Sequence, residues 1–250
     1  MFNFFVSLNY RQGNCFYITG NDYNHIKNVL RMQIGEQILV SCEGTSSLCE
    51  LISLDGQTAV AHILKEDYKS TELPVSLHLF QGLPKADKFE LIIQKAVELG
   101  ATDIYPVEMK NCVVKLDDKK KKSKVERWQS IAESAAKQSK RNIIPTVHEV
   151  LNYNEALKVA QTLDMFMVPY ENAEGMKATA EALNTLTKSN SAGIFIGAEG
   201  GFTQKEIDDA IALGGKTVSL GKRILRTETA AITALSMCML YIEINKNEEQ

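Results

Sequence analysis

The stretch AGIFIGAEGGFTQKEIDDAIALGGKTVSLGKRILRTETAAITAL (192–235) shows the same order of elements twice: a strand, a loop and a helix. AGIFI and KTVSL have strand length, and each is followed by a loop and then by a segment with helical periodicity. Because parallel strands end at the same edge of a sheet, we expect the loops GAEGGF and GKRILR to converge there. A glycine-rich loop beside a loop with two arginines predicts a ligand site.

Each loop also has a plainer interpretation. The glycines of GAEGG suit a tight turn, and Thr203 and Glu206 have the spacing of a capping box. Thr227 or Thr229 can cap the last helix, whose dipole favours Glu228. The plainer interpretation of the two arginines in GKRILR is that they are solvated at the surface. The site hypothesis therefore depends on the two loops lying next to each other. GGKT (214–217) is not a phosphate-binding loop, because it runs into a strand.

Strands and helices alternate from residue 74 onward, which predicts an α/β sheet with helices on both faces. Residues 1–70 differ: five short strands and the helix NDYNHIKNVLRM (21–32) predict a small β-barrel. The polar segment KEDYKSTELP (65–74) is the predicted linker. The expected strands are 2–6, 15–18, 37–41, 48–54, 58–64, 75–80, 103–107, 146–149 and 164–168, and the expected helices 85–100, 124–141, 153–161 and 176–187.

Composition indicates a globular protein of the reducing cytoplasm. The 250 residues carry a formal net charge of −3, and the five cysteines are odd in number and scattered. We expect no metal site, because no His, Cys and carboxylate set has ligand spacing. The N-terminus lacks the pattern of a signal peptide, and no apolar run is long enough to span a bilayer, so no membrane partner is expected.

Basic residues outside the C-terminal loops are candidates for contacts to RNA phosphates. In the first domain they form one face of a small barrel, a fold that often binds RNA. In the second they are lysines at a helix start, where we interpret Lys88 as solvated, and a polar helix end. DDKKKKSK (117–124) is predicted to be a mobile charged loop. The candidates are Arg11, His25, Arg31, Lys85 and Arg141.

GAEGGFTQKEI followed by LGKRILRTETAAITAL closely resembles the C-terminal signature of the SPOUT superfamily of knotted methyltransferases. Within it, the chain is most similar to bacterial 16S ribosomal RNA uridine-N3 methyltransferases. HIKNVLRM, FELIIQKAVELGATDIYPV and RWQSIAESAAKQSKRNIIP resemble further family motifs in the same order, so the resemblance covers the whole chain.

The resemblance implies a PUA-like β-barrel domain over 1–70 and a SPOUT α/β domain with a trefoil knot over 74–250. It implies a homodimer that binds S-adenosylmethionine and methylates N3 of a uridine in the 16S rRNA of the small ribosomal subunit. Arg226 and Glu228 would lie at the reactive end. The implied cofactor contacts are Leu79, Gln81, Ile196, Gly197, Gly201, Leu220, Gly221, Ile224, Leu225 and Thr227.

The sequence departs from the family pattern at two places. Ala198 stands where the family usually has a proline, which gives the loop more backbone freedom. Met109, Lys110 and Asn111 replace a Ser-Glu-Arg triplet, so a role of that arginine in binding the target does not carry over. Three alternatives stay open: a ribose 2′-O-methyltransferase, a non-catalytic RNA-binding protein, and a nicotinamide-dependent oxidoreductase, against which the absence of G-x-G-x-x-G counts.

Overall fold

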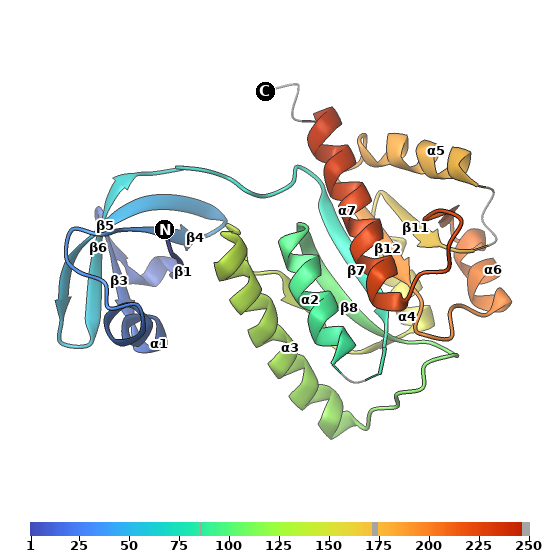
Figure 1. The fold of residues 1–250 in the computed structure, drawn as a ribbon, viewed down its shortest axis with the longest axis horizontal. Helices are drawn as coiled ribbons and strands as arrows, with labels where there is room; N and C mark the ends of the chain where they lie inside the picture. The colour runs from blue at the N-terminus through green and yellow to red at the C-terminus, as the bar shows by residue number, and fades with distance from the viewer. Residues whose placement is uncertain (86, 172–174, 247–250) are drawn as a thin grey trace. The chain divides into compact units, whose positions relative to one another are not determined.

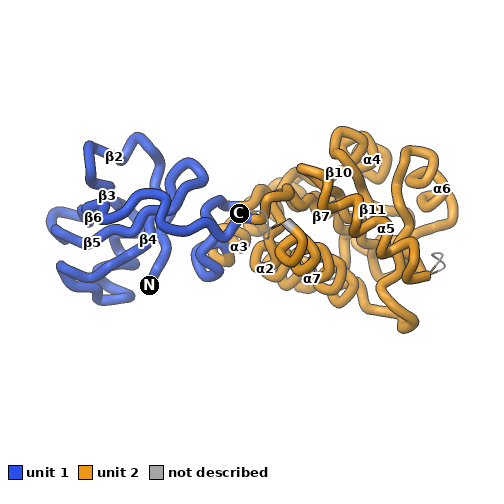
Figure 2. The backbone as a smooth tube through the Cα atoms, turned by 90° about the horizontal axis from the view of Figure 1, so that it is seen from above, with its two compact units in different colours: residues 1–72, 136–144 blue, residues 73–135, 145–250 orange. Residues whose placement is uncertain are grey.

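The computed structural model describes residues 1–85, 87–171 and 175–246. The chain divides into two compact units, shown in two colours in Figure 2. The first, unit 1, contains residues 1–72 and 136–144, and the second, unit 2, contains 73–135 and 145–250. The change at residue 72 lies inside the predicted linker, whereas the return of 136–144 to unit 1 has no sequence signal.

Unit 1 is built on one six-stranded sheet in the order β1-β4-β5-β6-β3-β2. All neighbours are antiparallel except β1 and β4, which run parallel. The sheet order has two ends, so the described hydrogen bonds do not close the predicted barrel. The strands are β1 (Asn3–Phe5), β2 (Arg11–Gln12), β3 (Cys15–Thr19), β4 (Gln37–Cys42), β5 (Thr45–Asp55) and β6 (Thr58–Lys65).

The single helix predicted over 21–32 is two short helical pieces. A 3-10 turn, η1 (Leu8–Tyr10), precedes it, α1 covers Gly20–Asn24, and a π-helical turn, η2, covers His25–Val29. Tyr23 and Ile26 are buried in the core of unit 1, together with Phe4, Phe16 and Ile38. Leu30 packs against this core as well, whereas Val29 is 63% exposed, so apolar spacing predicts the buried face only in part, and the backbone hydrogen bonding differs from that of a regular α-helix.

Residues 136–144 join unit 1 through a buried arginine. The Arg141 guanidinium donates from Nε to both carboxylate oxygens of Glu72, at 2.9 and 2.8 Å. Its carbonyl accepts from Asn3 Nδ2 at 2.9 Å. The whole Arg141 residue is only 2% exposed. The role predicted for Arg141, a contact to RNA phosphate, is wrong for this conformation, because its charged group is enclosed by protein.

Unit 2 contains a seven-stranded parallel sheet, which confirms the predicted α/β class (Figure 1). Its strands lie in the order β10-β8-β7-β12-β11-β13, and β9 is an additional neighbour of β8. The two strands of the opening stretch, β12 and β13, flank β11. The strands are β7 (Ser76–Gly82), β8 (Ala101–Glu108), β9 (Thr146–Val147), β10 (Leu151–Asn152), β11 (Met165–Pro169), β12 (Ser191–Ile196) and β13 (Lys216–Val218).

Helices cover both faces of this sheet, with α4 and α6 on one side and α2 and α7 on the other (Figure 2). A stack of Tyr105, Phe80 and Phe195, with ring centroids 4.6 and 4.5 Å apart, underlies α4 and α6. On the opposite face Cys238 of α7 contacts Met167. The helices are α2 (Lys88–Glu98), α3 (Asp118–Ser139), α4 (Tyr153–Ala160), α5 (Met176–Leu186), α6 (Gln204–Ala212) and α7 (Thr227–Lys246).

Two helices differ from expectation. The segment 117–124, predicted to be a mobile loop, is the start of α3, where Asp117 Oδ1 accepts from Lys120 N at 2.9 Å and Lys121 pairs with Glu108. In α7, residues Thr227–Asn245 are long and apolar enough to cross a membrane, with a mean hydropathy of 1.2. This is weak evidence for a span, because core helices have the same composition, and α7 packs on α2, α5 and β12.

Candidate active site

A cavity of about 640 Å³ lies in unit 2 where the loops that follow β11, β12 and β13 come together. These strands are parallel, so their carboxyl ends share one edge of the sheet, where α/β folds bind ligands. The loops GAEGGF and GKRILR both line it, as the opening stretch predicted. The lining residues are Lys88, Pro169, Tyr170, Glu171, Ile196, Gly197, Ala198, Glu199, Gly200, Gly201, Phe202, Ser219, Leu220, Gly221, Lys222, Arg223, Ile224, Leu225, Arg226, Thr227 and Ala230.

The glycine loop folds tightly back on itself. Gly201 has a φ of +63°, a left-handed conformation that favours glycine, and its N–H donates to Ala198 O at 2.9 Å. A Cβ on Gly197 would lie 3.1 Å from the Cα of Gly201. A Cβ on Gly82, at the end of β7, would lie 2.6 Å from Ala198 N. Glycine is therefore required so that the ends of β7 and β12 can approach one another and leave backbone groups facing the cavity.

Thr227 joins the three chain segments that meet beneath the cavity. Its hydroxyl donates to Gly197 O at 2.6 Å and accepts from Gln81 Nε2 at 2.9 Å. Gln81 is completely buried, and its Oε1 has no hydrogen-bond partner among the described residues. Thr227 is thus the first residue of α7 and also a bridge between β7 and the glycine loop.

A lysine and two carboxylates form a charged cluster at the same wall. Lys88 Nζ, from the first residue of α2, lies 3.1 Å from Glu199 Oε1 and 3.6 Å from Glu228 Oε2. Glu199 also accepts from Lys85 N at 3.0 Å. Burial opposes ionisation of Glu199, yet the hydrogen bonds from Lys85 N, its own N–H and Lys88 prevail and keep the pKa of Glu199 below its usual value.

The residues that replace the family triplet support the glycine loop. Asn111 Nδ2 donates to the carbonyls of Gly200 and Gly201, at 3.0 and 3.3 Å. Lys110 N donates to Glu206 Oε1 at 2.9 Å, and Glu206 completes the predicted capping box with Thr203. Position 111 therefore contributes an amide to the loop instead of a positive charge.

Most of the predicted cofactor residues line the cavity. Ile224 lines the cavity although its residue surface is 88% exposed. Leu79 and Gln81 are completely buried and lie outside the lining, and Glu228 borders it through Lys88. The predicted residues that line the cavity are Ile196, Gly197, Gly201, Leu220, Gly221, Ile224, Leu225, Arg226 and Thr227.

Sequence reasoning missed Lys88 and Glu199. Lys88 was interpreted as solvated, and the structure shows this to be wrong, since two carboxylates lie within 4 Å of its ammonium. Its partners are separated from it by more than a hundred residues, so the sequence carries no spacing signal for the cluster. Tyr170 and Glu171 were missed as well, because they follow β11 without any motif.

The RNA candidates of unit 1 lie in different environments. Arg11 pairs with Glu66 and lies over the Phe16 ring, 5.7 Å from its centroid. His25 and Arg31 are exposed, and His25 packs edge-on against Phe4. In unit 2, Lys85 is exposed.

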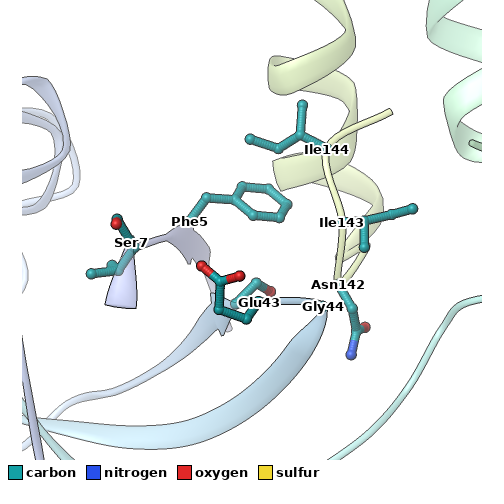
Figure 3. A pocket seen from close by; sticks show the side chains of 9 residues that line it. Phe5, Ser7, Glu43, Gly44, Asn142, Ile143 and Ile144 are labelled. Carbon is teal, nitrogen blue, oxygen red and sulfur yellow. The ribbon is translucent and has the colours of Figure 1, made fainter. Parts of the chain in front are cut away.

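A shallow depression of about 300 Å³ lies beside β1 and residues 142–144 in unit 1 (Figure 3). Glu43 is the one charged side chain among its described lining residues. A negatively charged lining does not suit a phosphate ligand. Nor does the described part of the chain hold any group of three His, Cys, Asp or Glu side chains placed to bind a metal.

Comparison with known proteins identifies the family. The RNA methyltransferase domain matches residues 71–239, and the RNA methyltransferase PUA domain matches 18–64. The chain is 40% identical over 238 residues to ribosomal RNA small subunit methyltransferase E of Bacillus subtilis (strain 168), covering 94% of this chain and 93% of the relative. The chain belongs to the ribosomal RNA small subunit methyltransferase E family.

Other members of the methyltransferase E family agree with this assignment. The relative from Mesomycoplasma hyopneumoniae (strain 232) is 35% identical, with 96% of this chain and 99% of that one covered. The crystal structure of the Neisseria gonorrhoeae member, bound to S-adenosyl methionine, superimposes with a TM-score of 0.82 at 32% identity, covering 96% and 97%. The predicted family and the PUA-like first domain are thereby confirmed.

Proposed function

We propose that this chain transfers a methyl group from S-adenosylmethionine to N3 of a uridine in the 16S rRNA of the small ribosomal subunit. The observation that carries the proposal is the cavity into which the glycine loop and the arginine loop both open. Membership of the methyltransferase E family supports the substrate class. The uridine and its N3 atom come from the sequence resemblance.

The cavity suits S-adenosylmethionine in size and in chemistry. Its volume lies within the roughly 300–1,000 Å³ typical of small-molecule sites. Gly197, Gly200 and Gly201 present backbone without side chains, while Leu220 and Leu225 supply apolar surface. When bound, the cofactor supplies an electrophilic methyl group on a sulfonium.

Uracil N3 becomes a nucleophile only after it loses its proton, so the site must stabilise a negative charge on the base. Arg226 is exposed at the cavity, where its guanidinium would hold the developing charge on a uracil oxygen. Glu228, a half-buried carboxylate in the first turn of α7, would remove the proton directly or through water. The target base must leave its stack for N3 to reach the cavity.

The wider assembly of the proposed enzyme follows from the resemblance. The C-terminal segment would thread a trefoil knot in which Leu220–Leu225 cradle the cofactor, and a second copy of the chain would complete a homodimer next to Arg226. No metal takes part in the proposed transfer.

Methyl transfer to small subunits from a strain that lacks this gene tests the proposal. Wild-type protein with saturating S-adenosylmethionine is expected to produce N3-methyluridine, detected by mass spectrometry of nucleosides from 16S rRNA. Arg226→Ala should lower kcat by about 10²–10³, the usual loss for a group that stabilises charge in the transition state. A wild-type kcat in this variant would remove the catalytic role of Arg226, and methylation of ribose would refute the N3 assignment.

RNA contacts by the exposed cations are tested through salt dependence. Arg11, His25, Arg31 and Lys85 are the proposed phosphate contacts: the last three are exposed, and Arg11 is partly exposed and paired with Glu66. Arg31→Ala should weaken binding to 16S rRNA and reduce the slope of log affinity against log salt by about one. Lys177→Ala, which removes an exposed cation from α5, is the control. Equal slopes in the wild type and Arg31→Ala would exclude this contact.

A further inference from the structure

Lys88 lies between two carboxylates, and Glu199 has a further hydrogen-bond donor whereas Glu228 Oε2 has none among the described residues. Glu199 accepts from Lys85 N as well as from Lys88. Glu228 Oε2 is buried and has no hydrogen-bond partner in the described chain. The Lys88 ammonium lies 3.6 Å from this oxygen. The side chains of Lys88 and Glu228 are 32% and 17% exposed. At such burial a charge pair is screened much less than at an open surface.

Glu199 fixes the position of the Lys88 ammonium. Lys88 is the first residue of α2, and Glu228 lies in the first turn of α7, which packs against α2. Without Lys88, two carboxylates anchored on neighbouring segments would face one another at the cavity wall. Like charges in a partly buried site repel one another strongly, so the two side chains would move apart.

We propose that Lys88 is a positioning residue for methyl transfer: its ammonium, held by Glu199, fixes the Glu228 carboxylate in place beside the cavity. The inference rests on the proposed role of Glu228 in removing the N3 proton. Lys88 acts through Glu228 and not on the uracil itself. The charged groups around Glu228 and the cavity are Lys88, Glu171, Glu199, Lys222, Arg223 and Arg226.

Two consequences separate this role from a merely structural one. Lys88→Gln should lower kcat by about 10-fold, because the Glu228 carboxylate would lose the cation that holds it and would face Glu199. Glu199→Gln, added to Lys88→Gln, should recover part of kcat, since it removes the repelling carboxylate. Lys88→Arg should recover most of the wild-type kcat, because it keeps the positive charge.

The second consequence is seen in binding alone. S-adenosylmethionine carries one more positive charge than S-adenosylhomocysteine, and Lys88 contributes a positive charge to the cavity wall. Lys88→Gln should therefore raise the affinity for S-adenosylmethionine relative to that for S-adenosylhomocysteine. The ratio of the two affinities, measured by calorimetry, should increase by about 3- to 10-fold. Lys95→Gln, on the same helix but paired with Glu98, is the matched control and should leave the ratio unchanged.

A wild-type kcat in Lys88→Gln, or an unchanged affinity ratio, would overturn the proposal. So would failure of Glu199→Gln to recover kcat in the double variant. Glu228→Gln distinguishes this failure from that of the proposed function. A wild-type kcat in Glu228→Gln eliminates the base and with it the role of Lys88, whereas loss of kcat there with a wild-type kcat in Lys88→Gln eliminates Lys88 alone.

Discussion

The Thr227 hydroxyl makes both of its hydrogen bonds to protein, one to Gly197 O and one to Gln81 Nε2. The resemblance placed Thr227 and Gln81 among the cofactor contacts. Their geometry indicates a different task, which is to hold the ends of β7 and β12 and the start of α7 at fixed distances around the cavity. Such a residue affects the cofactor through the loop that it supports.

Thr227→Val tests this at the residue scale. The change keeps the shape of the side chain but leaves Gly197 O without its donor, and it leaves a buried Gln81 with one partner fewer. We expect the unfolding free energy to fall by about 1–3 kcal/mol and the affinity for S-adenosylmethionine to fall with it. Thermal unfolding and calorimetry measure the two effects.

Thr227→Ser is the matched control, because it retains the hydroxyl. Wild-type stability and cofactor affinity in Thr227→Val would show that these two hydrogen bonds do not hold the loop. A loss in both variants would point to the methyl group of Thr227 instead.

At the scale of elements, apolar periodicity identified the main helices and strands of both units. It failed where the decisive interaction is tertiary. α3 begins at Asp118, within a lysine-rich segment with no apolar pattern, and the contact of Lys121 with Glu108 is invisible in sequence. The cap that Asp117 provides is local and could have been recognised. The π-helical turn His25–Val29 has the same apolar spacing as an α-helix, so periodicity cannot distinguish them.

The candidate site likewise contains residues that the sequence predicts and residues that only the fold brings together. The loops 197–202 and 221–226 were predictable because each follows a strand in a parallel sheet. Lys88 was not, because its role depends on Glu199 and Glu228, which the fold brings to it. The absence of a family arginine at position 111 became interpretable only when Asn111 was seen to donate to the glycine loop.

At the scale of the whole molecule, buried charged groups make stability depend on pH. In unit 2, His78 Nδ1 lies 3.7 Å from Asp103 Oδ2, and His148 Nε2 contacts Asp103 Oδ1 at 2.7 Å. Burial lowers the pKa of His78 below its usual 6.5, and this exceeds the opposing effect of Asp103. The pKa of Asp103 is lowered as well, because hydrogen bonds and nearby imidazoles outweigh its burial.

Both shifts destabilise the folded chain in acid. Below pH 6.5 the unfolded chain binds a proton at position 78 more readily than the folded one, so stability falls as the pH drops from 6.5 toward the folded pKa of His78. The contribution of Asp103 is lost later, as the pH falls below 3.8. We expect the melting temperature to decrease between about pH 7 and pH 5, and His78→Gln to flatten that decrease.

His25→Gln, which replaces an exposed histidine of unit 1, serves as the control variant. An equally steep decrease in His78→Gln and in the wild type would assign the acid sensitivity to other groups.

The return of residues 136–144 to unit 1 has a consequence for synthesis. Asn3, Ser41 and Glu72 all bond to groups of Arg141 or its neighbour Asn142. These hydrogen bonds cannot form until Asn142 has emerged from the ribosome, by which time more than sixty residues of unit 2 have emerged as well. Unit 1 therefore cannot finish folding as soon as its first 72 residues have emerged, as an uninterrupted N-terminal domain could, and Glu72 lacks these partners until α3 is complete.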